Sequence, residues 1–509
     1  RLESTPWTFN DGPAELNARM TFGSFGTYNP HISLRQRINS SYALKASLNC
    51  TYTKGDYPFE LRNDRIITSE RRVNSDVKSY AAEADIYADW RSRGRLKGKV
   101  NFHSSERGLP GSVILYTQNA YERLWDRSVI SNLMYDCNLG TRWKFHADAG
   151  FTSSFNRHLD TNPIYPSSQD SRYTQNEYSI AARSLYEPAE CWRIVIAEDI
   201  VCNTLVSNIP ECPFPVRISS ITALSARYVS DRITISANLV GTYMTEKLVM
   251  GNGPDDSFRI TPMAAASWML RDGLRLRASY KEGFRQPTFN DLYYARVGNM
   301  NLRPETARQF NLGLTFSGTY SWGSADITAD TYYSSIKDKI VAIPTMFIWK
   351  MRNVGAVAMY GTDITASTLW KVSDWIKIHT NANYSLQYAL DVTNHDSKSY
   401  LHQIPYTPRH CGNLSLTAET KWLNLSYRMI ASGKRYDKGQ NIPAHEIPSY
   451  ADHNISLNRE FVLGQQHGCR MQISLEALNL GGKNYEVIHF YPMPGRSYRI
   501  TLKIKYRSS

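Results

Sequence analysis

The chain has 509 residues, of which 21% are charged and 12% aromatic, and tyrosine alone contributes 33. This composition is not that of a low-complexity disordered protein. The mean hydropathy is −0.45 and no uncharged apolar run reaches 18 residues, so a helical membrane protein is excluded. A soluble protein or a β-barrel remains, because a closed barrel satisfies its backbone in lipid while half of its side chains stay polar.

The formal net charge is +13. Such an excess can serve nucleic acid, membrane phosphates or an anionic ligand. Lysine and arginine are dispersed along the chain and no nucleic-acid motif accompanies them, so we do not expect nucleic acid as a partner.

The seven cysteines form no C-x-x-C pair and have irregular spacing: Cys50, Cys137, Cys191, Cys202, Cys212, Cys411 and Cys469. A zinc site and a disulfide framework both lack support in such a pattern. We therefore expect isolated cysteines that pack as small apolar residues.

Alternation of apolar and polar residues is the dominant pattern along the chain. An opening strand is expected from residue 17 to 28, and the segments 233–239, 274–281 and 498–506 alternate most clearly. Alternation over about 8–10 residues predicts strands with one apolar face. That face could meet a second sheet or lipid, and loop asymmetry distinguishes the two, because outer-membrane barrels have short turns at one end and long loops at the other.

The C-terminal half shows this asymmetry. Long gaps alternate there with short ones between ten expected strands, at 274–282, 306–317, 325–336, 354–366, 375–388, 411–419, 422–432, 451–460, 470–479 and 496–506. The spacing is about 24 residues per strand, which gives about 21 or 22 strands for the whole chain. Since antiparallel barrels of this kind have even numbers of strands, we predict an all-β transmembrane barrel of about 22.

Aromatic residues gather near the ends of the expected strands: Tyr280, Phe284, Tyr332, Tyr333, Trp370, Trp375, Tyr427 and Tyr506. Aromatic girdles at the two membrane interfaces would explain the excess of tyrosine. The alternative is that aromatic residues simply favour strands.

No catalytic constellation stands out, since G-x-S-x-G, H-E-x-x-H and P-loop motifs are all missing. His445-Glu446 lacks a second histidine at helical spacing and is interpreted as a solvated pair. Two acidic loop clusters could offer oxygen ligands to Ca²⁺ but lack the glycine and final glutamate of an EF-hand: Asp255 with Asp256, and Asp391 with Asn394 and Asp396. We expect neither an enzyme, nor a resident cofactor, nor a defined metal site.

Residues 283–293 read G-F-R-Q-P-T-F-N-D-L-Y and closely resemble the G-F-R-x-P-x-x-x-E-L-Y box of TonB-dependent receptors. Residues 298–305, G-N-M-N-L-R-P-E, are similar to their G-N-P-N-L-K-P-E box. Further matches follow in family order at 336–340 with 353–363, at 404–413, at 432–436 with 448–450, and at 479–498. Each box alone is weak, but six in the right order are specific to the family.

The resemblance implies a transmembrane antiparallel β-barrel with long extracellular loops and short periplasmic turns, in the outer membrane of a Gram-negative bacterium. We expect residues 1–16 to lead into a barrel at 17–506, followed by a tail at 507–509. The family also has an N-terminal plug and a segment that contacts TonB, and residues 1–16 are too short for either. The expectation is therefore that the plug is absent from this chain, and that residues 1–509 alone do not transport actively.

The resemblance further implies a large scarce nutrient as the ligand. The runs at 287–294, 337–345 and 403–408 look most like the cobalamin (vitamin B12) transporters of Bacteroidota. A ferric siderophore is the alternative. Haem is disfavoured, because haem receptors of the family carry a histidine between the first two boxes, and no histidine lies between Pro287 and Gly298 in this chain. A passive porin is the rival of another class. Expected partners are the nutrient, the missing plug, TonB through that missing region, outer-membrane lipid and, as a further candidate, a surface lipoprotein.

Eight residues of the expected outer loops are predicted to face the side from which the ligand arrives: Arg285, Gln286, Asn290, Tyr293, Tyr294, Arg303, Trp349 and Tyr436. Aromatic rings can pack on a large planar ligand, while amides and arginine can bond its polar rim. The alternative for Arg285 and Asn290 is that they only tie their own loop together.

Overall fold

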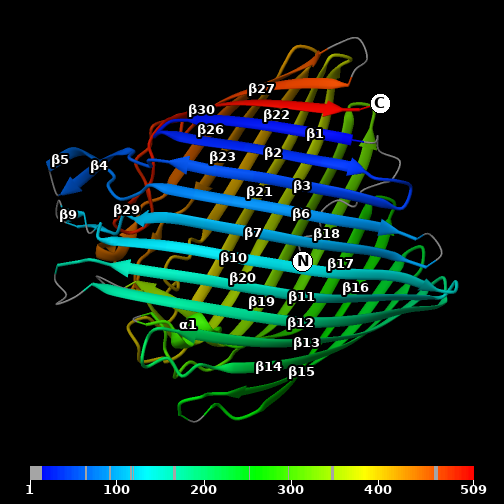
Figure 1. The fold of residues 1–509 in the computed structure, drawn as a ribbon, viewed down its shortest axis with the longest axis horizontal. Helices are drawn as coiled ribbons and strands as arrows, with labels where there is room; N and C mark the ends of the chain where they lie inside the picture. The colour runs from blue at the N-terminus through cyan, green and yellow to red at the C-terminus, as the bar shows by residue number, and fades with distance from the viewer. Residues whose placement is uncertain are drawn as a thin grey trace.

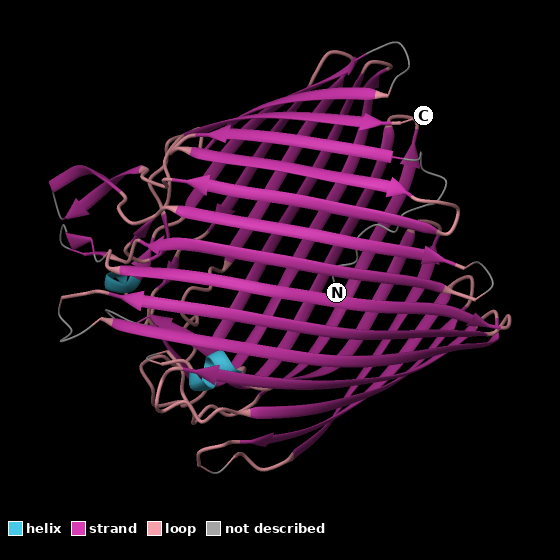
Figure 2. Cartoon of the chain, in the orientation of Figure 1, coloured by secondary structure: helices cyan, strands magenta, loops and turns pink. Residues whose placement is uncertain are grey.

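The computed structural model describes residues 14–508, apart from 64–65, 91–92, 115–116, 119, 164–167, 252, 296, 345–348 and 464–467. Antiparallel strands wind around a central lumen throughout this part of the chain (Figures 1 and 2). Within it, no helix is long and apolar enough to cross a membrane.

Twenty-two strands form a single sheet. The first eleven are β1 (Ala14–Gly23), β2 (Thr27–Arg37), β3 (Tyr42–Thr53), β6 (Val77–Asp89), β7 (Arg95–Leu109), β10 (Glu122–Leu139), β11 (Trp143–Asp160), β12 (Gln169–Ala189), β13 (Trp192–Ser207), β14 (Val216–Val229) and β15 (Ile233–Lys247). The other eleven are β16 (Ser257–Arg271), β17 (Leu274–Arg285), β18 (Glu305–Tyr320), β19 (Gly323–Pro344), β20 (Trp349–Ser373), β21 (Ile376–Asp391), β22 (His410–Thr420), β23 (Asn424–Ser432), β26 (Tyr450–Leu463), β27 (Cys469–Leu478) and β30 (Ser497–Arg507).

The sheet closes on itself. Each of these strands pairs antiparallel with the next, and β30 pairs with β1, with Tyr506 opposite Leu16 and Arg499 opposite Gly23. Closure leaves the 22-stranded sheet, as far as its residues are described, without a free edge strand, which a lipid environment requires. The predicted barrel of 22 strands is confirmed, and so are the ten strands expected between residues 274 and 509.

The two ends of the barrel differ. At one end, the short-turn end, strands are joined by turns of two to five residues. At the other, the long-loop end, connections such as 54–76, 286–304, 392–409 and 479–496 are much longer and lie together in Figure 1. This is the predicted asymmetry of an outer-membrane barrel.

The long loops carry the remaining elements. Four small hairpins lie there, β4–β5 (Pro58–Asn63, Ile66–Arg71), β8–β9 (Val113–Ile114, Thr117–Gln118), β24–β25 (Arg435–Tyr436, Glu446–Ile447) and β28–β29 (Glu486–Ile488, Tyr491–Pro492). A short helix, α1 (Phe289–Tyr293), and a 3₁₀ turn, η1 (Pro443–His445), complete the described elements (Figure 2).

Alternation sorts the side chains into two faces. On the outer face Phe22, Ile32 and Ile500 are about half exposed, as expected for side chains that meet lipid. Polar side chains of the same strands line the lumen, where Thr21 and Thr501 are hydrogen-bonded at 2.9 Å between their hydroxyl oxygens.

Tryptophans form a girdle at the short-turn end. Exposed rings mark the strand ends or turns there, namely Trp143, Trp192, Trp268, Trp322, Trp370, Trp375 and Trp422. Several stack on a neighbour, as Trp322 does on Trp370 with ring centroids 4.5 Å apart. The expected aromatic girdle is present at this end. The prediction that Tyr332 belongs to a girdle is wrong, because its hydroxyl donates to the Oε1 atom of Gln387 on the lumen wall.

The residues at which the first strand begins and the last strand ends differ slightly from those expected. β1 begins at Ala14 rather than residue 17, because its first residues pair with both β2 and β30. β30 ends at Arg507, and the backbone nitrogen of Ser508 donates to the Ala14 carbonyl at 2.9 Å. Residues 1–13 of the expected leading segment lie outside the described residues, as does Ser509 of the tail. All seven cysteines are free.

Candidate functional site

The connection from β17 to β18 contains most of the residues predicted to face a ligand. Thr288 caps α1, because its Oγ1 atom accepts from the backbone nitrogen of Asp291 at 3.2 Å, and Asp291 in turn accepts from the backbone nitrogen of Thr288 at 2.9 Å. Arg285 donates to the same carboxylate at 3.1 Å. The end of β17 and the first turn of α1 are therefore locked together.

One side of α1 is buried in an apolar cluster at the mouth of the barrel. Phe289, Leu292 and Tyr293 contribute from α1, and the other buried members come from several strands and loops: Tyr173, Leu205, Cys212, Leu302 and Ile340. The segment 286–304 is thus a folded platform rather than a solvated loop.

A buried ion pair supports the platform from below. Arg217 of β14 and Glu246 of β15 face each other in register, and the Arg217 Nε atom donates to Glu246 Oε2 at 2.6 Å. Arg217 also donates to the carbonyl of Pro287 at 2.9 Å and lies over the Phe289 ring, 4.8 Å from its centroid. Two strands of the wall therefore hold the start of the platform through a single guanidinium.

The Tyr293 hydroxyl donates to the other oxygen of Glu246. Burial, together with this contact to a carboxylate, raises the pKa of Tyr293 far above its usual value. Tyr293 is thus a neutral donor whose hydroxyl is committed to Glu246. In this structure it supports the platform from beneath.

A stacked pair holds the far end of α1. Tyr294 lies on Tyr173 of β12 with ring centroids 3.8 Å apart and planes 10° from parallel. The Tyr173 hydroxyl accepts from the backbone nitrogen of Ala295 at 2.7 Å. Burial raises the pKa of Tyr294 to about 12, so its hydroxyl stays protonated at neutral pH.

Gln175 of β12 joins the same corner. Its Nε2 atom donates to the Tyr294 hydroxyl at 2.9 Å and to the Oδ1 atom of Asn290. Asn290 is exposed, and its amide nitrogen has no hydrogen bond to another described residue. Gln286 is half-buried, with an Oε1 atom that lacks a partner among the described residues. The platform therefore presents the exposed amide of Asn290 beside the half-buried ring of Tyr294.

The other predicted residues lie around this platform. Arg303 at its end is 68% exposed and forms an ion pair with Asp338, with Nε and Oδ1 2.8 Å apart. Trp349 is the first residue of β20, and its side chain lies outside the described part of the chain. Tyr436 belongs to the separate hairpin β24–β25, where its carbonyl accepts from the backbone nitrogen of Tyr406 at 2.8 Å. Five of the eight residues thus lie in segment 286–304, namely Gln286, Asn290, Tyr293, Tyr294 and Arg303, while Arg285 borders it at the end of β17 and Tyr436 stands apart.

A cavity of about 500 Å³ lies between the β19–β20 hairpin and the loops that contain Tyr406, Arg435 and Ile488. Its walls are mostly apolar, with Ile343, Ile404 and Ile488 among them. Arg435 fixes one wall, because its buried guanidinium donates to the carbonyl of Val487 at 2.9 Å. The volume falls in the range of small-molecule pockets.

In both acidic clusters a carboxylate accepts a hydrogen bond from a nearby hydroxyl group. The Asp256 carboxylate accepts from the Tyr243 hydroxyl at 2.6 Å, and Asp391 accepts from Ser399 at 2.8 Å. Within the described ranges, no group of three histidine, cysteine or acidic side chains is placed to hold a metal ion.

A sequence-family model described as TonB dependent receptor-like, beta-barrel, matches residues 4–484. The chain belongs to this family. Two related proteins are both named vitamin B12 transporter BtuB. The one from Photobacterium profundum is 26% identical over 249 residues, which cover 48% of this receptor chain and 37% of the relative. The one from Vibrio vulnificus is 35% identical over 97 residues, or 19% and 15% of the two chains. The receptor chain therefore matches well under half the length of these relatives.

Solved structures share the fold of the receptor. The copper transporter OprC superposes with a TM-score of 0.78 at 13% identity, covering 99% of this receptor chain and 82% of its own. The FrpB iron transporter from Neisseria meningitidis gives 0.75 at 13%, covering 97% and 81%. The ferric-catecholate import receptor Fiu from K12 E. coli gives 0.74 at 11%, covering 98% and 82%. The family is one of transport receptors rather than enzymes.

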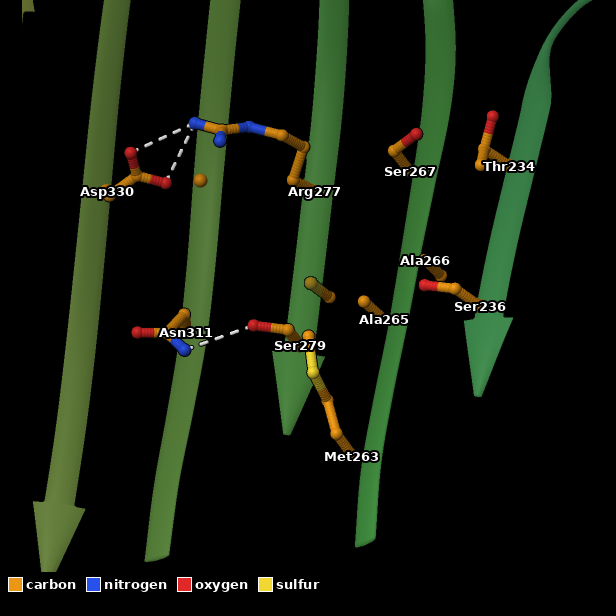
Figure 3. Close-up of a pocket in the computed structure, with 12 residues that line it drawn as sticks. Thr234, Ser236, Met263, Ala265, Ala266, Ser267, Arg277, Ser279, Asn311 and Asp330 are labelled. Carbon is orange, nitrogen blue, oxygen red and sulfur yellow. Dashed lines mark hydrogen bonds and ion pairs between the residues drawn. The ribbon is translucent and has the colours of Figure 1, made fainter. Parts of the chain in front are cut away.

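The lumen wall of the receptor contains side chains that reach across a whole strand. Arg277 of β17 extends over β18 to Asp330 of β19, with its Nη2 atom 2.8 Å from Oδ1 (Figure 3). The residue of β18 beneath this contact is Gly313, where a Cβ atom would lie 2.0 Å from Asp330 Oδ1. Tyr332 likewise extends over Gly361 of β20, where a Cβ atom would lie 2.8 Å from its hydroxyl, to reach Gln387.

These contacts predict coupling between Gly313 and Asp330. We expect Gly313→Ala to break the ion pair and lower the free energy of unfolding by about 1 kcal/mol, since the pair is about a third exposed. Asp330→Ala should lose a similar amount, and the double variant little more than either single one, because the same contact is removed. Urea unfolding of the refolded barrel measures this cycle, and additive losses would contradict the coupling.

Four supporting residues of the receptor belong to no motif that the sequence analysis identified, namely Tyr173, Gln175, Arg217 and Glu246. Each is 40 or more residues from the segment it holds, so no local motif connects them. The signal that could have found Arg217 and Glu246 is strand register, because they are cross-strand neighbours in β14 and β15.

Proposed function

We propose that this receptor imports a large scarce nutrient across the outer membrane of a Gram-negative bacterium, and that the nutrient is cobalamin. The observation that carries the proposal is the sequence relationship to two vitamin B12 transporters. The copper and iron receptors among the structural neighbours share only the fold at 11–13% identity, so they do not favour their own cargo here. Energy would come through TonB, with a plug in the lumen and, as a further partner, a surface lipoprotein.

The platform at 286–304 is the part of the mouth that we propose contacts the nutrient. Asn290 and Tyr294 offer an amide and a ring side by side, and Arg285 and Arg303 are exposed at its two borders. Gln286, Trp349 and Tyr436 complete the proposed contact set, while Tyr293 acts from below by holding Glu246. A corrin ring with amide side chains is large, planar and polar at its rim, which suits such a surface.

Binding of labelled cobalamin to the receptor in outer-membrane vesicles tests the proposal. We expect saturable binding that unlabelled cobalamin abolishes and a ferric siderophore does not. Asn290→Ala should weaken the affinity about tenfold, because one exposed hydrogen-bonding group to the ligand is lost. Asp272→Asn, in a turn at the short-turn end, serves as the matched control and should bind normally.

Two outcomes would contradict parts of this proposal separately. Saturable binding of a ferric siderophore with none of cobalamin would replace the substrate. Unchanged cobalamin affinity in Asn290→Ala would mean that Asn290 only ties the platform to Gln175.

A further inference from the structure

The cavity of about 500 Å³ at the long-loop end lies beside the platform but not within it. The end of β19 separates the two. Ile340 packs into the apolar cluster of the platform, whereas Lys339 and Val341, its two neighbours in the strand, line the cavity. Successive residues of a strand point to opposite faces, so platform and cavity lie on different sides of the strand end. The cavity can therefore take a ligand of its own.

Most of the cavity wall is apolar. Its apolar members come from β19, β20, the loop 392–409 and β28, and include Val341, Ile343, Val354, Ile404, Pro405 and Ile488. A surface of this kind favours an alkyl chain or an apolar ring, because contact removes apolar area of both partners from water. The larger part of a fitting ligand is therefore apolar.

Two cations, Lys339 and Arg435, stand in this apolar wall. As far as the wall is described, no aspartate or glutamate lines it, and neither cation forms an ion pair with an acidic side chain of the described ranges. Lys339 is half-buried, and its Nζ atom lies 3.8 Å from the sulfur of Met359, a weak acceptor. The cavity therefore has a positive charge that the surrounding side chains do not neutralise.

Arg435 is firmly held and keeps one nitrogen unused. The residue is only 3% exposed, and its Nε and Nη2 atoms donate to the carbonyl of Val487 at 3.3 and 2.9 Å. Its guanidinium also lies over the ring of Tyr450, 5.6 Å from the centroid. The Nη1 atom is buried and has no acceptor among the described residues. Since an unpaired buried donor is costly, an acceptor that enters the cavity beside Arg435 gains a hydrogen bond that the protein leaves unmade.

We propose that this cavity binds an amphiphilic carboxylate, a single negative charge on an apolar chain. The carboxylate would meet Arg435 and Lys339, and the chain would lie against the apolar wall. Nε and Nη2 of Arg435 are committed to backbone carbonyls, so the anion is held through Nη1 rather than as a bidentate pair. A neutral alcohol leaves both cations without a counter-charge, and a short anion such as acetate leaves the apolar wall uncovered.

Equilibrium dialysis of labelled decanoate against the receptor in lipid nanodiscs tests the proposal, with empty nanodiscs correcting for decanoate dissolved in lipid. We expect saturable binding at a single site. Decanol, which has the chain without the charge, and acetate, which has the charge without the chain, should each compete about tenfold more weakly. Decanol that competes as well as decanoate, or decanoate that does not bind saturably, would overturn the proposal.

Excess cobalamin in the same dialysis tests whether the site is separate from the platform. We expect decanoate to stay bound, because the platform lies on the other side of the β19 end. Displacement of decanoate by cobalamin would overturn the assignment of a separate ligand. A receptor that binds decanoate but not cobalamin would refute the proposed nutrient and leave the carboxylate site standing.

Two variants locate the carboxylate. Lys339→Met should weaken decanoate binding about fivefold and Arg435→Met about tenfold, because each removes one positive charge and keeps an unbranched side chain. Lys337→Met is the matched control, since Lys337 is an exposed lysine of β19 outside the cavity, and it should bind like wild type. Arg435 also anchors β28, so Lys339→Met is decisive. Unchanged affinity in this variant, with the heat-modifiable gel migration of a folded barrel, would contradict the placement of the carboxylate.

Discussion

Replacing Glu246 with leucine should collapse the platform at the mouth while leaving the barrel closed. The substitution leaves the Arg217 guanidinium buried without its carboxylate, because Arg217 is only 8% exposed. Removing one partner of a buried ion pair typically costs about 3–5 kcal/mol. Much of this cost can be avoided if segment 286–304 detaches and admits water to Arg217, so we expect rapid proteolysis of that segment and loss of ligand binding.

The double variant Arg217→Leu with Glu246→Leu separates charge burial from packing. Two apolar residues of similar volume can replace a buried ion pair at little cost, so the double variant should be more stable than Glu246→Leu alone. It would still lack the hydrogen bond from Arg217 to the Pro287 carbonyl. Limited proteolysis and urea unfolding compare the three proteins, and equal behaviour of the single and double variants would contradict an electrostatic cause.

Gly361→Ala should be the most costly single methyl addition that we describe in the wall. A Cβ atom at Gly361 would lie 2.2 Å from the carbonyl oxygen of Leu386 in β21 and 2.8 Å from the Tyr332 hydroxyl. The first contact is with backbone, so the strands themselves must separate locally. Overpacking of this kind costs about 1–3 kcal/mol, and we expect the upper part of that range in urea unfolding.

Gly241→Ala is the matched control for this experiment. Gly241 also lies within a strand, β15, but its nearest neighbour to an added Cβ would be a ring carbon of Phe258 at an ordinary 3.6 Å. The control should lose less than about 1 kcal/mol. If both variants unfold at the same urea concentration, the close approach at Gly361 does not determine stability.

The architecture could be predicted because lipid imposes a simple pattern. In β30, and in β17 from Leu274 to Tyr280, every second residue is apolar, and this repeat alone located both strands to within about three residues. The strands of the N-terminal half were harder to find. β13 illustrates why, since Glu198 and Thr204 stand on its outer face where the pattern calls for apolar residues. Deviations from the repeat therefore concealed this strand.

The residues of the candidate site could be predicted from the sequence only where they are adjacent in the chain. Arg285 to Tyr293 belong to one family motif and, with Tyr294 directly after them, lie close together in the structure. Their supports come from β12, β14 and β15, and nothing in the motif predicts which residues of those strands will meet it. The prediction that Tyr293 faces the ligand did not include Glu246, which is the residue that holds the Tyr293 hydroxyl in the structure.

The side chains that cross a strand also bear on how the barrel reaches its correct pairing. Arg277 can meet Asp330 only if Gly313 of the strand between them lies directly beneath the contact. A shift of β18 by two residues would keep its apolar side chains in lipid, yet it would put Asn311 or Thr315 in that place and block the bridge. The hydrophobic pattern alone tolerates such a two-residue error. A glycine beneath a charged pair does not tolerate this shift, because any side chain in its place blocks the pair. The lumen wall therefore constrains the strand register in a way that the lipid-facing side cannot.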